Sequence, residues 1–152
     1  MPAWRSDQYA LDCIKTHRAW IEGKLKQWEA GRANRQVITD QMRQEGIAKA
    51  KEVIPRRVAY YAARMGLTGR YNRITIKEQK TRWGSCSTKG NLNFNWRLML
   101  MPDRLLDYVV VHELAHLYEM NHSSRFWRIV EGQIPDYKER RELLNQLGKQ
   151  YQ

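Results

Sequence analysis

The stretch from Val109 to His122 limits the possible folds most, because three of the four histidines lie within eleven residues of it. His112 and His116 are four residues apart, so on a helix they share one face, about 6 Å apart along the axis. His122 follows six residues later, and a continued helix would carry it about 9 Å beyond His116. If the three histidines act together, the helix must end before His122 and the chain must turn back. We expect Asn121 to make this turn in the left-handed conformation that Asn tolerates.

The residue after the first of these histidines completes the pattern H-E-x-x-H. Glu113 is about 100° further round the helix, which places its carboxylate beside an ion bound by His112 and His116. Three neutral imidazoles leave the fourth position of Zn²⁺ open, as in catalytic zinc sites, and water there has a pKa of about 7. Glu113 is suited to accept its proton as a general base. The spacing therefore predicts one Zn²⁺ held by His112, His116 and His122.

An alternative interpretation needs no metal. His112 and His116 could be core histidines that hydrogen-bond to backbone carbonyl groups, with His122 exposed on a loop. A thiolate site is not expected, since Cys13 and Cys86 lack C-x-x-C spacing.

Length and composition indicate a single globular domain spanning residues 1–152. A chain of 152 residues that is 42% hydrophobic, with six Trp and eight Tyr, can bury a core. It contains no run of 18 apolar residues, so we expect no transmembrane span and no membrane partner. The sequence after Met1 lacks an apolar signal region, and the two cysteines show no disulfide pattern, so we expect a cytoplasmic protein.

The net charge of +11 is unevenly distributed. Residues 1–80 contain 17 Lys and Arg against 8 Asp and Glu, whereas residues 81–152 contain 10 against 8. This divides the domain into a basic helical part, 1–66, and a part with the sheet and the metal site, 70–152. A basic half suggests DNA, RNA or another acidic partner, with the best candidates for contact being Arg56, Arg57 and Arg64. The alternative is that these charges are solvated helix faces.

Helical periodicity dominates the first part of the chain. Residues 5–29 predict one helix, which contains His17 as an ordinary packing or surface residue, and residues 31–35 form a polar linker. Thr39 is suited to cap a second helix. We expect Pro55 to kink or divide it and Gly66 to end it.

The periodicity then changes to that of strands. Ile74 and Ile76 alternate with polar residues, and a turn at 87–90 precedes a longer alternating run at 92–100. These patterns predict a hairpin with one face on the core. We also hypothesise that residues 92–100 form an exposed sheet edge, to which an extended peptide substrate could add by backbone hydrogen bonds.

The metal helix and the closing helices follow. Pro102 and Asp103 predict the start of the metal helix, which is apolar nearly all round and therefore buried. Packing must override the low helix propensity of its three consecutive valines. Ser123 or Ser124 is expected to cap a short helix in which Trp127 fixes the loop that carries His122. A last helix runs from about Pro135 to Gly148.

Several segments together resemble the YgjP-like metallopeptidase family, which is similar to the SprT-like and WLM groups. The matching segments lie in order over about residues 70–140: Lys80–Cys86, Asn95–Leu98, Asp107–Leu117, Asn121–Ser123 and Phe126–Trp127. The resemblance implies a minimal zincin-like fold, zinc bound by His112, His116 and His122, and Glu113 as the general base. Some relatives of the family degrade proteins crosslinked to DNA, which gives the basic half added interest.

The group that stabilises the oxyanion of the reaction is not identified by spacing. Candidates for this role or for substrate binding are Tyr118, Tyr137, Arg82 and Arg97, although each is also a common packing or hydrogen-bonding residue.

The sequence therefore predicts an α+β, zincin-like fold. It combines N-terminal helices, a small antiparallel or mixed sheet, a buried H-E-x-x-H helix and C-terminal helices. The predicted function is a zinc-dependent metallopeptidase that acts on a protein or peptide substrate, and the basic half extends this prediction to substrates associated with nucleic acid. The alternative is a nucleic-acid-binding or scaffolding module with a structural zinc site, and hydrolysis of a non-peptide amide is a third reading.

Overall fold

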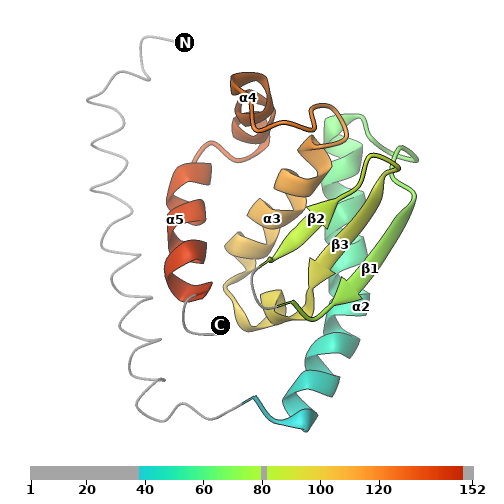
Figure 1. Ribbon diagram of the computed structural model, residues 1–152, viewed down its shortest axis with the longest axis vertical. Coiled ribbons are helices and arrows are strands. Elements are labelled where there is room, and N and C mark those ends of the chain that lie inside the picture. The colour runs from blue at the N-terminus through green and yellow to red at the C-terminus, as the bar shows by residue number, and fades with distance from the viewer. Residues whose placement is uncertain (1–37, 80–81, 149–152) are drawn as a thin grey trace.

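The computed structural model describes residues 38–79 and 82–148, and the predicted helix 5–29, linker 31–35 and His17 lie outside this range. Helices surround a small mixed sheet, which confirms the predicted α+β class (Figure 1). The elements are, in chain order, α2 (Asp40–Met65), β1 (Arg73–Lys77), β2 (Gly84–Cys86), β3 (Asn91–Asn95), the 3₁₀ helix η2 (Trp96–Leu100), α3 (Asp103–Ala115), α4 (Ser124–Gln133) and α5 (Tyr137–Gly148).

The sheet has the strand order β1-β3-β2. Strands β2 and β3 form the predicted antiparallel hairpin, with Ser85 opposite Asn93, and β1 runs parallel to β3, with Ile74 opposite Leu92. Because β3 is paired on both sides, the hypothesis that residues 92–100 form an exposed edge is wrong. The edges of this sheet are β1 and β2.

Only the first half of the predicted strand 92–100 is a strand. Strand β3 ends at Asn95, and residues 96–100 form η2. The side chain of Asn95 accepts a hydrogen bond from the amide of Arg97 (3.0 Å) and donates to the carbonyl groups of Gln79 (2.6 Å) and Arg82 (3.0 Å). These hydrogen bonds turn the backbone away from the β-sheet hydrogen bonds of β3. The alternating sequence pattern correctly indicated that Trp96 and Leu98 are buried, but not that the strand ends before them.

Helix α2 is continuous, so Pro55 does not divide it; the alternative expectation, a kink at Pro55, stays a prediction. Thr39 caps the helix as expected, since its hydroxyl accepts from the amide of Met42 (3.1 Å), and Gly66 ends it at φ 72°. The hydrogen bond that Pro55 cannot donate would reach the carbonyl of Lys51, an exposed residue that water can satisfy. The buried residues on either side of the proline hold the helix together by packing.

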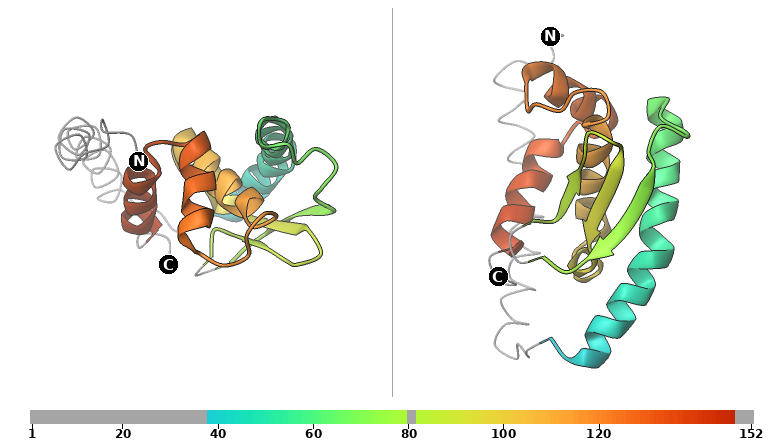
Figure 2. Two further views of the ribbon diagram at one scale, coloured as in Figure 1. Left: turned by 90° about the horizontal axis from the view of Figure 1, so that it is seen from above. Right: turned by 45° about the vertical axis from the view of Figure 1, so that its right-hand side comes forward.

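Helices α2 and α3 lie side by side on one face of the sheet, and α5 packs on α3 from the other side (Figures 1 and 2). Helix α3 is therefore surrounded, and all three valines at 109–111 are buried. This burial explains how packing overrides their weak helix propensity. Across residues 38–79 and 82–148, no helix is both long and apolar enough to cross a membrane.

Candidate metal centre

His112, Glu113 and His116 lie at the C-terminal end of helix α3. The helix ends at Ala115, whose carbonyl accepts from the amides of Tyr118 and Glu119 at 3.0 Å each. Residues 116–118 continue as a turn, and the chain then returns so that the ring centre of His122 lies 4.8 Å from that of His116. The predicted left-handed Asn121 is wrong, because positive φ angles occur only at glycines in the described part of the chain.

The three histidine rings form a nearly equilateral triangle. Their centres are 5.0 Å apart for His112 and His116, 5.2 Å for His112 and His122, and 4.8 Å for His116 and His122. One ligand atom from each ring lies within 4.8 Å of the others. Zn–N bonds of about 2.0–2.1 Å in tetrahedral geometry place the ring centres of three histidine ligands roughly 5 Å apart. The donor set therefore fits a single zinc ion.

Phe126 forms the floor of this triangle. Its ring centre lies 5.0 Å from that of His112, 4.5 Å from that of His116 and 5.0 Å from that of His122, and its side chain is fully buried. The residue stands in the first turn of α4, where the hydroxyl of Ser123 caps the helix by accepting from the Phe126 amide (3.3 Å). Ser123 is thus the cap that the sequence left open between two serines.

Trp127 holds the exposed third histidine in place. Its ring stacks on that of His122 at 5.8 Å with 24° between the planes, and it also lies 5.8 Å from the ring of His112. On α5, Tyr137 stacks on Trp127 at 5.2 Å with 13° between the planes. These contacts are the ones expected if Trp127 fixes the loop that carries His122, and that role stays a prediction.

Hydrogen bonds at Nδ1 orient the two helical histidines. Nδ1 of His116 lies 3.1 Å from the carbonyl oxygen of Glu119, and Nδ1 of His112 lies 3.2 Å from Oε2 of Glu113. In this arrangement Nδ1–H donates and Nε2 keeps its lone pair for an ion. Burial, reinforced by His112 and His116, lowers the pKa of His122. This favours the neutral imidazole that a metal requires.

The carboxylate of Glu113 is buried, with only 4% of the residue exposed, and lies against strand β2. A Cβ added to Gly84 would stand 3.1 Å from both Cγ and Oε2 of Glu113. Further along β2, burial and then the charge of Glu113 raise the pKa of Cys86 to about 11. This thiol therefore stays protonated at neutral pH, which agrees with a site made of histidines.

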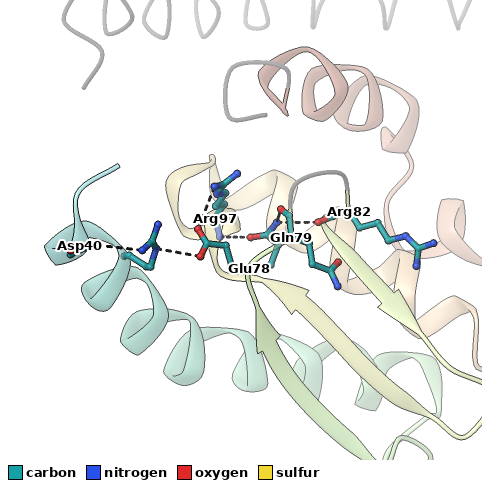
Figure 3. A network of polar contacts seen from close by, with 7 residues as sticks. Asp40, Glu78, Gln79, Arg82 and Arg97 are labelled. Atoms are coloured by element: carbon teal, nitrogen blue, oxygen red, sulfur yellow. Dashed lines mark hydrogen bonds and ion pairs between the residues drawn. The ribbon is translucent and has the colours of Figure 1, made fainter. Parts of the chain in front are cut away.

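Two of the four candidates for oxyanion or substrate binding are used elsewhere. The hydroxyl of Tyr118 donates to the carbonyl of Met65 at the end of α2 (2.5 Å). Arg97 lies beyond the opposite end of α3 from His116 and pairs with Glu78 at 3.3 Å (Figure 3). That pair belongs to a network in which Arg43 contacts both Glu78 and Asp40 at 3.3 Å.

The other two candidates differ in their surroundings. Arg82 is exposed just before β2, and its side chain points away from the Glu78–Arg97 pair (Figure 3). Tyr137 is buried beneath Trp127, at the side of the metal centre. Their suggested functions stay predictions.

Sequence reasoning missed Arg141, whose Cζ lies 5.0 Å from the Trp127 ring. Only its spacing of four residues from Tyr137 hints that the two share a face of α5. Nearby, burial raises the pKa of Tyr108 to about 12, with Arg141 opposing the shift and Glu113 adding to it. Tyr108 thus stays protonated next to His112, whose ring centre is 5.9 Å from its own.

The three arginines suggested for a nucleic-acid contact all have partners. Arg57 forms two hydrogen bonds to Asp107 on α3 (2.8 and 2.6 Å), and Arg56 pairs with Glu52 (3.2 Å). Arg64 donates to Gln133 and to Tyr60, both at 3.1 Å. The Arg57 pair joins α2 to α3 and thereby supports the fold behind the metal centre. A nucleic-acid contact of these residues stays a prediction.

Comparisons with known proteins agree with this geometry. A family model described as YgjP-like, metallopeptidase domain matches residues 31–147. Crystal structures of the metallopeptidase zymogens abylysin from Pyrococcus abyssi and jannalysin from Methanocaldococcus jannaschii are similar in fold, with TM-scores of 0.54 and 0.53. They are 22% and 24% identical in sequence, and each match covers 64% of this chain and 94% or 95% of the other. A search of curated proteins found no match.

Proposed function

The chain belongs to the YgjP-like metallopeptidase family, and we propose that it hydrolyses peptide bonds with one Zn²⁺ held by His112, His116 and His122. The observation that carries this proposal is the triangle of histidine rings, 4.8–5.2 Å on each side, next to a buried glutamate. When bound, zinc supplies a Lewis acid that lowers the pKa of water to about 7 and polarises a carbonyl group.

Glu113 is the general base of this proposal. Its carboxylate is held between Nδ1 of His112 and the backbone at Gly84, so its direction is set before substrate arrives. A carboxylate with one oxygen hydrogen-bonded keeps lone pairs with which it can accept a proton from the attacking nucleophile and pass it to the leaving amine. A scaffold with structural zinc would not need this group.

Strand β2 offers the place for an extended substrate. Of the described residues, β2 pairs only with β3, and Gly84 brings this edge against Glu113. A peptide that adds to β2 through backbone hydrogen bonds would lie beside the histidine triangle and would be held without reading its sequence. This moves the edge hypothesis from residues 92–100 to residues 84–86.

The two alternative functions, a nucleic-acid-binding or scaffolding module and hydrolysis of a non-peptide amide, have less support. Family membership favours peptide bonds over other amides, and two of the three suggested patch arginines are paired with carboxylates. Measuring affinity for DNA and RNA across a salt series tests the basic half directly, because phosphate contacts give a steep salt dependence. No binding at low salt would remove the nucleic-acid reading.

The experiment that tests the proposed function is Glu113→Gln, with the exposed Glu45→Gln on α2 as the matched control. We expect Glu113→Gln to keep one zinc per chain by metal analysis and to lose turnover of a casein-type substrate by at least about 10²–10⁴-fold. Glu45→Gln should retain both metal and turnover. Undiminished hydrolysis by zinc-loaded Glu113→Gln would refute the assigned base.

A further inference from the structure

An exposed guanidinium lies at the side of the metal centre. Cζ of Arg141, on α5, is 5.0 Å from the ring of Trp127, and that ring is 5.8 Å from those of His112 and His122. Together these separations place the guanidinium within about 11 Å of both histidine rings. The position is open to solvent, so a bound peptide can reach it.

The surroundings of Arg141 differ from those of its neighbour. Arg140 pairs with Asp136 at 3.1 Å and donates to the carbonyl of Arg104 at 3.2 Å. Within residues 38–79 and 82–148, no carboxylate lies at ion-pair distance from Arg141. A guanidinium that rests on an aromatic face keeps its in-plane N–H groups available, and these match a carboxylate with two parallel hydrogen bonds.

The distance fits a group on a bound substrate. An extended peptide advances about 3.3–3.6 Å per residue, so 11 Å corresponds to no more than about three residues from the scissile bond. The net charge of +11 also favours acidic substrates.

We propose that Arg141 binds a carboxylate of the peptide substrate, from an acidic side chain or from the free C-terminus, and so determines substrate preference. Trp127 and Arg141 then form a carboxylate subsite next to the histidine triangle. This inference rests on the proposed function, because it assigns the neighbouring surface to the same substrate.

The first test compares Arg141→Gln with Lys49→Gln, which removes one charge from an exposed position of α2, away from α5 (Figure 1). Substrates are matched quenched peptides that carry Glu or Gln near the cleavage site, each with a free or an amidated C-terminus. We expect Arg141→Gln to lower kcat/KM about tenfold to a hundredfold for the peptides with the recognised carboxylate and less than about twofold for the neutral ones. Whichever of the two carboxylates shows this dependence is the source.

A second test measures binding without turnover. Isothermal titration of the same peptides into Glu113→Gln, with and without Arg141→Gln, should show the same selective loss of affinity. Arg141→Lys should recover part of it, because lysine keeps the charge but not the paired N–H groups. Unfolding temperatures within about 2 °C of each other verify that the variants are folded.

The two tests separate the two proposals. Cleavage that falls equally for acidic and neutral peptides in Arg141→Gln would overturn the carboxylate subsite and would instead indicate a role at the reacting carbonyl. Peptides that bind through Arg141 but are never cleaved would leave the subsite intact and refute the proposed function. Equal affinities with and without Arg141 would refute the subsite alone.

Discussion

The metal centre joins two regions of opposite character. His116 and Glu113 come from a helix that the fold encloses, and their exposed fractions are 8% and 4%. His122 comes from an exposed turn and is held by the aromatic rings at the start of α4. Packing of the hydrophobic core positions the first region. Contacts with Phe126 and Trp127 position His122 in the second region. Changes to the two regions should therefore have different consequences.

Replacing a histidine by alanine should give the largest effects, and the stability of the metal-free variants should differ between the two regions. We expect His116→Ala and His122→Ala each to weaken zinc binding by at least about a hundredfold, since each removes one of three protein ligands. Without metal, His116→Ala should also destabilise the fold by about 1–2 kcal/mol, because it leaves a space beneath Phe126 and orphans the Glu119 carbonyl. His122→Ala should change the unfolding free energy by less than about 0.5 kcal/mol.

Competitive chelator titration and urea unfolding of the metal-free proteins make these measurements. Equal stability of metal-free His116→Ala and His122→Ala would contradict the difference between a ligand positioned by the core, His116, and one positioned on a loop, His122.

Trp127→Leu should affect the second region more than the first, because the ring stacks on His122 but only meets His112 edge-on. Loss of the ring that stacks on His122 releases the turn, and we expect zinc affinity to fall about tenfold to a hundredfold, as for other groups that orient ligands. Trp127→Phe keeps an aromatic face and should retain most of the affinity. Zinc titration followed by a competing indicator gives both values, and a Trp127→Leu protein with normal affinity would show that His122 is held by other contacts.

Gly84→Ala should damage the first region with a smaller effect and without loss of metal. The new methyl group would stand 3.1 Å from Cγ and Oε2 of Glu113 and 3.1 Å from the backbone oxygen of Asn93. Since the side chain yields more easily than the backbone of β3, we expect the carboxylate to move by a few tenths of an ångström. We expect kcat to fall about tenfold, since small displacements of a reacting group are costly.

Gly132→Ala is the matched control, because a methyl group there meets nothing within 4 Å in α4. It should leave kcat unchanged. Steady-state kinetics of zinc-loaded proteins decide the matter: an unchanged kcat in Gly84→Ala would show that Glu113 does not depend on the close approach of β2.

The first region is also the part of the site that the sequence predicts well. Helical spacing brings His112 and His116 to one face without knowledge of the rest of the fold, and the valine run correctly indicated burial. Thr39 and Gly66 were predicted correctly, and Ser123 was one of two adjacent candidates, because caps depend on local chemistry.

Features that depend on distant partners were missed. Strand β2 lies at an edge because β1 pairs with β3 and not with β2. The alternation of residues along one strand does not show which strands are its neighbours. The turn at Asn95 depends on carbonyl groups 13 and 16 residues away. Arg141 meets the metal centre only because α5 packs on α3, so no local pattern identifies it.

The contact of Phe126 with all three histidines bears on how an ion enters. Many small zinc proteins gain their structure only when the metal arrives, because nothing else gathers the ligands. Here the Phe126 ring contacts all three histidine rings, and the stacking of Trp127 on His122 and the hydrogen bonds at Nδ1 of His112 and His116 add to this contact. We therefore expect zinc binding to leave the helix content of the chain unchanged, which far-ultraviolet circular dichroism with and without chelator measures.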